Sequence, residues 1–173
     1  MHYLHQKARN NGIQLLHGWA VADIQTQSDG TVTLKGSKKE EIHASKAIIA
    51  TNGFARKLLP DFDVTPVRNQ VLITEPIPHL KLKGTFHYHQ GYVYFRNVGN
   101  RVLIGGGRHL YKKAETTGAF GLTEEVQAYL ENFLRSHILK DIPFQVDHRW
   151  SGILGVGKAK HPIIEECMPS VYA

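Results

Sequence analysis

The segment from Lys46 to Gly53, with the sequence Lys-Ala-Ile-Ile-Ala-Thr-Asn-Gly, constrains the fold of this chain most strongly. An uninterrupted apolar run of this kind predicts a strand that is buried on both faces, as in a parallel sheet. Ligands of such sheets bind just beyond the carboxyl ends of the strands, where Thr51, Asn52 and Gly53 lie. Glycine there would let a ligand approach the backbone closely. The alternative interpretation is a buried strand followed by an ordinary turn.

The composition indicates a folded protein without a membrane span. Of the 173 residues, 42% are hydrophobic and 21% are charged, a balance that supports a packed core and disfavours disorder. No apolar run approaches the roughly 20 residues that cross a bilayer, and the first residues lack the apolar core of a signal peptide. Cys167 is the only cysteine, so no internal disulfide can form. We therefore expect a cytoplasmic protein.

The net charge of +6 suits an anionic small molecule or nucleic acid as a partner. The basic residues are scattered, however, and the adjacent lysine pairs Lys38-Lys39 and Lys112-Lys113 both lie in predicted polar loops. Proteins that bind nucleic acid usually gather such residues on one face. We therefore interpret the basic residues mainly as solvated surface and expect no nucleic-acid partner.

The first part of the chain has the pattern of an α/β domain. Residues 2–10 predict the end of a helix, which the sequence Asn10-Asn11-Gly12 stops. Strands are then predicted over 12–17, 20–27, 31–34 and 41–43. Asp29-Gly30 predicts a type I′ hairpin turn, in which both central residues have positive φ. A helix that leads directly into a strand is typical of a crossover unit, so we expect an earlier strand in the parent domain.

The part after Leu58-Leu59-Pro60 predicts an antiparallel sheet with a covering helix. Short turns that contain Pro and Gly separate β segments at 67–74, 85–89, 91–97 and 101–104. Thr123 is predicted to cap a helix that runs to Ile138 with one apolar face. A last strand follows over about 145–156. The predicted fold class is therefore α/β (α+β).

His87 and His89 form the first candidate site. On a strand, alternate residues point to one face, so both imidazoles could reach one metal ion. A zinc or iron site needs at least one further ligand, and no spacing nearby supplies it. We therefore predict no metal site, and a metal-dependent enzyme using His87 and His89 remains an alternative.

Tyr92, Tyr94 and Arg96 form the second candidate, because their spacing of two places all three on one face of a strand. Two phenols and a guanidinium could line a substrate pocket that holds a carboxylate. The alternative is an aromatic face packed under the helix over 123–138.

The run Gly105-Gly106-Gly107 could expose amides to a phosphate. Nucleotide loops run directly into a helix, which is not predicted here, so close backbone packing is the favoured interpretation.

Five segments, taken in order, resemble the D-amino-acid-oxidase-like family of FAD-dependent oxidoreductases, which includes glycine oxidases, sarcosine oxidases and D-amino-acid dehydrogenases. They cover nearly the whole chain and comprise Asn11–Val21, Ala47–Ala55, Thr65–Leu72 (Thr-Pro-Val-Arg-Asn-Gln-Val-Leu), Tyr94–Gly107 and Arg149–Ile164.

The resemblance implies part of an FAD-binding α/β domain over 1–57, a substrate-binding antiparallel sheet over 58–150 and a return towards the FAD-binding domain over 151–173. It implies oxidation of a small amine or amino acid by hydride transfer to the flavin of FAD. The residues that it places near FAD are Val21, Ala50, Thr51, Asn52, Gly53, Trp150 and Gly152.

Three family features are missing from the sequence. The Gly-x-Gly-x-x-Gly loop for the pyrophosphate is absent, and so is a glycine-rich helix start that contacts the flavin. The arginine that often follows the Trp-x-Gly strand is replaced by the sequence Ile153-Leu154-Gly155. We therefore expect a fragment that binds FAD weakly on its own. Such a fragment could form oligomers. Its catalytic residues are not evident from the sequence. A non-catalytic binding or assembly module is the alternative.

Overall fold

The computed structural model describes residues 2–38, 40–159 and 161–173, so Lys39 of the Lys38-Lys39 pair lies outside the described residues. The chain divides into two compact units. Unit 1 contains residues 1–50, 57–60 and 163–173, and unit 2 contains residues 51–56 and 61–162.

Unit 1 begins with helix α1 (His2–Asn10) and an antiparallel three-stranded sheet of order β1-β2-β3. Its strands are β1 (Val21–Thr26), β2 (Val32–Gly36) and β3 (Glu41–Ala44), as predicted. The predicted strand over 12–17 is wrong, because no described strand pairs with this segment and its large side chains Ile13 and Leu16 are 55% and 61% exposed. A strand without a neighbour leaves its backbone hydrogen bonds to water.

The hairpin between β1 and β2 is confirmed, but its turn is not of type I′. Of the two central residues, only Gly30 has a positive φ, of 82°. The amide of Gly30 donates to the carbonyl of Gln27 at 3.0 Å, which closes a three-residue loop of the kind that ends in a left-handed glycine. The carboxylate of Asp29 accepts hydrogen bonds from the amide and the hydroxyl of Thr31, at 2.9 and 2.6 Å, and so holds the loop.

The second sheet of unit 1 contains β4 (Ala47–Ile48), β10 (Glu166–Met168) and β11 (Val171–Tyr172), in the order β10-β11-β4. The pairing of β11 with β4 is parallel, which confirms the parallel strand predicted for the Lys46–Ala50 run. The prediction that both faces are buried is wrong within the described chain. Ala47 and Ile49 are buried whereas Ile48 is 79% exposed, because the described residues pack against only one face.

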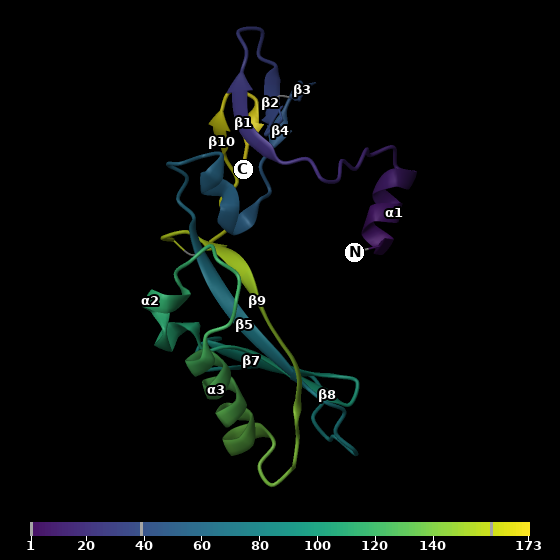
Figure 1. Ribbon diagram of the computed structural model, residues 1–173, viewed down its shortest axis with the longest axis vertical. Coiled ribbons are helices and arrows are strands. Elements are labelled where there is room, and N and C mark those ends of the chain that lie inside the picture. The colour runs from purple at the N-terminus through teal and green to yellow at the C-terminus, as the bar shows by residue number, and fades with distance from the viewer. Residues whose placement is uncertain (1, 39, 160) are drawn as a thin grey trace. The chain divides into compact units, whose positions relative to one another are not determined.

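Unit 2 is built on a five-stranded antiparallel sheet of order β6-β7-β8-β5-β9 (Figure 1). Its strands are β5 (Thr65–Thr74), β6 (Thr85–Tyr88), β7 (Val93–Val98), β8 (Arg101–Gly106) and β9 (Val146–Val156). The long strands β5 and β9 lie side by side and pair along most of their length. The antiparallel sheet predicted from the short turns is therefore confirmed.

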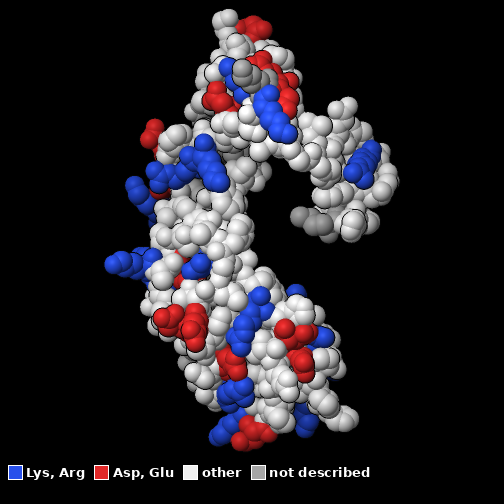
Figure 2. Space-filling model, viewed as in Figure 1, with Lys and Arg blue, Asp and Glu red and all other residues white. Residues whose placement is uncertain are grey.

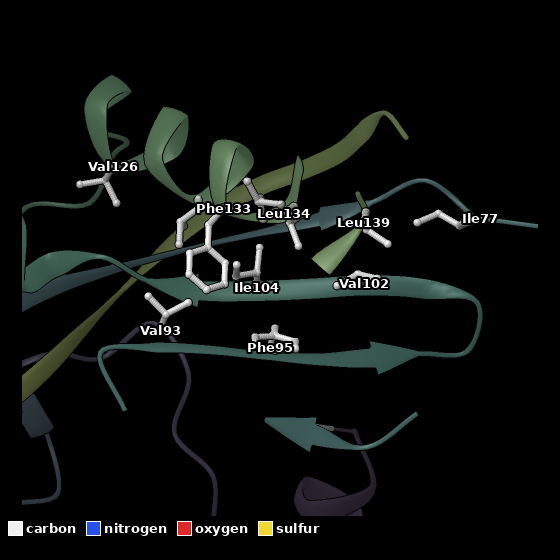
Figure 3. Close-up of a cluster of buried hydrophobic side chains, with 11 residues drawn as sticks. Ile77, Val93, Phe95, Val102, Ile104, Val126, Phe133, Leu134 and Leu139 are labelled. Carbon is white, nitrogen blue, oxygen red and sulfur yellow. The ribbon is translucent and has the colours of Figure 1, made fainter. Parts of the chain in front are cut away.

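One face of this sheet is covered by α3 (Glu124–Phe133), which continues into a π-helical turn, η3 (Leu134–Ile138). The apolar face of α3 meets the side chains of β7 and β8 in the main core, shown in Figure 3. The predicted apolar face of this helix is thus confirmed. Fully buried members of the core are Leu72, Val93, Val102, Ile104, Val126, Leu130 and Leu134.

Thr123 stands at the N-cap of α3, but its hydroxyl makes no cap hydrogen bond, which contradicts the predicted capping role. The hydroxyl instead donates to the carboxylate of Glu115, in the short helix α2 (Lys112–Glu115), and accepts from Arg68. Two further short helices complete unit 2, η1 (Asn52–Lys57), whose last residue belongs to unit 1, and η2 (Arg108–Leu110).

None of the described helices has the length and apolar character needed to cross a bilayer. Figure 2 shows basic and acidic side chains interspersed on the visible face rather than separated into patches of one sign.

Candidate functional site

The predicted site residues of unit 2 meet on the sheet face that α3 does not cover, which we call the open face. Strand pairing aligns His87 with Tyr94, Tyr94 with Gly105, Gly105 with Val71, and Val71 with Trp150. Paired residues share a face, and their neighbours along each strand point to the other face. Among those neighbours, the apolar residues Leu72, Val93, Phe95 and Ile104 pack in the core under α3. Tyr94 and Trp150 therefore belong to one row across the open face.

Tyr94 is held in place within this row. Its hydroxyl accepts a hydrogen bond of 2.8 Å from the amide nitrogen of Asn69 on β5. Burial raises the pKa of Tyr94, and the hydrogen bond from Asn69 offsets part of that rise. A Cβ atom at Gly105 would overlap the phenol, so glycine lets the ring lie flat against β8. The close backbone packing predicted for the glycine run is thereby confirmed at Gly105.

Arg96 follows Tyr94 by two residues on β7, so both share the open face, and Arg96 is exposed. The alternative that this face packs under the helix is wrong, because the intervening residues Val93 and Phe95 make the core contacts instead. Tyr92 precedes β7 and its ring stacks on His109 with 4.4 Å between ring centroids. The structure thus brings Tyr94 and Arg96 together and directs Tyr92 to a pocket at the end of the sheet.

The β9 edge of the open face is apolar and uncovered within the described chain. Trp150 is 41% exposed and Leu154 is 43% exposed. Between them, a Cβ atom at Gly152 would meet no atom within 4 Å. An exposed indole beside open space above a glycine fits a flat aromatic ring, and the flavin of FAD is such a ring.

Asn52 and Gly53 make contacts that hold η1 against β9. The side-chain oxygen of Asn52 accepts from the amide of Gly155 at 2.6 Å, and its nitrogen donates to the carbonyl of Ile153 at 3.3 Å. A Cβ atom at Gly53 would lie 2.8 Å from Ile153. These contacts need no ligand, so the assignment of Asn52 and Gly53 to FAD remains a prediction. The same holds for Thr51, an exposed residue of unit 2, and for Val21 and Ala50 of unit 1.

The two histidines of the metal alternative do not follow strand geometry. Strand β6 ends at Tyr88, and His89 has a φ of 52°, so the alternation that would align His87 with His89 is broken. The ring of His87 faces Tyr94, whereas the ring of His89 lies 5.0 Å from that of His109. The part of the chain that the structure describes contains no cluster of three or more His, Cys, Asp or Glu residues suited to a metal.

Sequence reasoning missed a buried polar network under α3. Glu115 is fully buried and forms an ion pair with Arg68, with 2.8 Å between Nη2 and Oε1. Gln70, also fully buried, donates to Glu115 at 2.9 Å and accepts from the side chain of Gln127 at 3.0 Å. The signal that could have found it is the polar sequence Arg68-Asn69-Gln70 in the middle of an otherwise apolar strand.

An antiparallel sheet of this kind is what the resemblance predicted for residues 58–150, and comparison with known proteins defines the class. The family model DAO, FAD dependent oxidoreductase, matches residues 1–173. The chain belongs to this family of FAD-dependent oxidoreductases. The family resemblance seen in the five sequence segments is thereby confirmed.

Solved structures share the fold of the chain. L-proline dehydrogenase from P. horikoshii has a TM-score of 0.78 at 18% identity, over 96% of this chain and 46% of that chain. Glycine oxidase from Geobacillus kaustophilus has a TM-score of 0.78 at 21% identity, over 95% of this chain and 44% of that chain. L-amino acid deaminase from Proteus vulgaris has a TM-score of 0.69 at 18% identity, over 96% of this chain and 42% of that chain. The chain therefore spans about half the length of these proteins. No curated protein matches the sequence.

Proposed function

We propose that this chain takes part in the FAD-dependent oxidation of an amine or amino acid, and that its open face is the wall against which the substrate binds. The observation that carries the proposal is the strand register, which gathers Tyr94, Arg96, Trp150 and Gly152 on one uncovered face. Membership of the FAD-dependent oxidoreductase family supports the redox class. The names of the similar structures, glycine oxidase and L-amino acid deaminase among them, support a small amino compound as substrate.

Each residue on this face has a role that its chemistry suits. Trp150 and the open space above Gly152 would accept the flat flavin ring. Arg96 would attract a substrate carboxylate, since a guanidinium donates two parallel hydrogen bonds. Tyr94, oriented by Asn69, would donate its hydroxyl proton to a substrate acceptor while its oxygen accepts from Asn69. When bound, FAD supplies the chemistry by accepting a hydride from the substrate carbon next to nitrogen.

Flavin reduction tests the proposal. The purified protein that contains this chain, reconstituted with FAD, is mixed anaerobically with amines and amino acids, and the flavin absorbance is followed. We expect at least one of these substrates to bleach the flavin. If FAD binds but no amine or amino acid bleaches it, the proposal is wrong, and a binding or assembly module becomes the better interpretation.

Arg96→Gln tests the proposed carboxylate contact within the same assay. We expect KM for a carboxylate-bearing substrate to rise about tenfold, because a charge-assisted hydrogen bond is lost. Lys81→Gln removes the same charge at an exposed loop position and is expected to leave KM unchanged. Equal effects of the two variants would show that Arg96 acts only through net charge.

The finer expectations from the sequence belong to the same proposal. The single cysteine supports a cytoplasmic location, and the scattered charges support a small-molecule partner rather than nucleic acid. Exposed apolar side chains such as Ile48 and Trp150 support association between copies of this chain. Because no Gly-x-Gly-x-x-Gly loop is present in the sequence, we expect FAD to bind the 173-residue chain weakly.

A further inference from the structure

A pocket of about 420 Å³ lies at one end of the open face. Thr65 and Val67 of β5 and Val156 of β9 are among the residues that line it. Strand pairing aligns Thr65 with Val156 and Val67 with Leu154, in the same alternation that aligns Asn69 with Gly152. These three lining residues therefore belong to the face that carries Gly152 and Trp150. A molecule on the open face could extend into this pocket.

The walls of the pocket are strongly basic. Arg108 of η2, Lys112 of α2 and Lys158, just after β9, all line it, and no Asp or Glu is among its lining residues. Within the described residues, none of these three side chains is in an ion pair. The nearby carboxylate of Asp63 accepts from the backbone amide of Lys158 at 3.1 Å. Three cations without paired carboxylates at one concave site attract an anion.

His109 supplies a second, independent indication of a ligand. It lines the same pocket, and both of its ring nitrogens are buried without a hydrogen-bond partner. Buried polar atoms in folded proteins are nearly always paired, so unpaired ones indicate a missing partner. Tyr92 stacks on this ring and also lines the pocket, which fixes the imidazole in place. A ligand with oxygen acceptors would pair with His109 as well as with the cations.

We propose that Arg108, Lys112, Lys158 and His109 form a binding site for a dicarboxylate at this end of the sheet. More than one carboxylate is inferred because three unpaired cations surround the pocket. Carboxylate oxygens accept hydrogen bonds from both lysine and arginine, and the latter can be bidentate.

Binding is tested by calorimetric titration of the 173-residue chain with succinate, acetate and inorganic phosphate at constant ionic strength. We expect succinate to bind at one site, about tenfold or more tightly than acetate, because each additional charge-assisted hydrogen bond adds affinity. Arg108→Gln, Lys112→Gln and Lys158→Gln are each expected to weaken succinate binding about tenfold. Lys113→Gln removes the same charge next to Lys112 but does not line the pocket, so it should bind succinate as the unaltered chain does.

Nuclear magnetic resonance of the imidazole provides a readout at the pocket itself. Burial, followed by the nearby charges of His89 and Arg108, lowers the pKa of His109. A bound dianion favours the imidazolium, so saturation with succinate should raise that pKa. Unchanged His109 signals, equal binding by the Lys112→Gln and Lys113→Gln variants, or tighter binding of phosphate than of succinate would each overturn the proposal. Succinate binding without flavin reduction by any amine would leave this subsite standing while the proposed oxidation fails.

Discussion

The guanidinium of Arg68 on β5 forms an ion pair with the carboxylate of Glu115 on α2, at 2.8 Å, and that carboxylate is wholly shielded from solvent. Gln70 donates to the same carboxylate at 2.9 Å, so several donors offset the cost of burying its charge. The pair ties the sheet to α2. Because Lys112 of α2 lines the basic pocket, the pair also anchors one side of that pocket.

Removing the cation of this pair should destabilise unit 2 strongly. Arg68→Met leaves the Glu115 carboxylate buried without its counter-charge, and we expect the free energy of unfolding to fall by about 3–5 kcal/mol. Arg135→Met, which breaks a half-exposed pair with Glu131, should cost less than about 1 kcal/mol. Urea unfolding followed by circular dichroism measures both. Equal losses of unfolding free energy in the two variants would contradict the expectation that an ion pair with a buried carboxylate contributes more to stability than a half-exposed one.

The same carboxylate should make stability depend on pH. Burial alone would raise the pKa of Glu115, but hydrogen bonds from Arg68, Gln70 and Thr123 outweigh it and hold the pKa below its ordinary value of 4.5. As the pH falls, the Glu115 carboxylate therefore takes up its proton at a higher pH in the unfolded state than in the folded state. The stabilisation is present above pH 4.5 and is lost as the pH falls through the folded-state pKa.

Glu115→Gln cannot undergo this titration. We expect the difference in urea midpoint between the unaltered chain and this variant to shrink as the pH is lowered from about 6 to about 3. A difference that stays constant over that range would show that the Glu115 pKa is the same in the folded and unfolded states.

Gly106 should tolerate no side chain. Its φ is 118°, and a Cβ atom would lie 2.1 Å from the carbonyl oxygen of Tyr92. We expect Gly106→Ala to lower the free energy of unfolding by about 1–3 kcal/mol, because the backbone must leave this conformation or move away from Tyr92. Gly152→Ala is the matched control, since its Cβ meets no atom and its φ is not positive; it should change stability by less than about 0.5 kcal/mol.

Asn52 should contribute to stability without any ligand. Asn52→Ala removes the acceptor for the Gly155 amide and places alanine at a φ of 52°, so we expect a loss of about 1–2 kcal/mol in the free energy of unfolding. Asn52→Gly removes the same hydrogen bonds but adopts that φ freely, so it should lose less. Thermal unfolding of the FAD-free chain measures both. No change in either variant would indicate that Asn52 serves a ligand alone.

Much of the sheet could be predicted from the sequence because turns and alternation are local signals. Most of β5 was predicted from the Pro-containing turns that follow it, β9 was predicted as the strand after Pro143, and α3 follows from its apolar spacing. The segment over 12–17 misled the prediction, because its apolar residues have no neighbouring strand among those described. Whether a strand forms depends on such a partner, which local composition does not specify.

The candidate site was predictable only in part. The spacing of Tyr94 and Arg96 was enough to place them on one face. The position of Trp150 in the same row depends on the register of β5 with β9, which is a property of the folded sheet. His89 departs from the strand pattern through its positive φ, and Arg108 joins Lys158 in a pocket only through the fold.

The parallel pairing of β4 with β11 has a consequence for biosynthesis. Val171 pairs with Ala47, and the whole of unit 2 lies between them in the sequence. Unit 1 therefore cannot complete its second sheet until the ribosome has released residues 171–172, whereas the strands of unit 2 can pair earlier. Until then the edge of β4 that pairs with β11 is unpaired, and unpaired strand edges make an incompletely folded chain prone to aggregation.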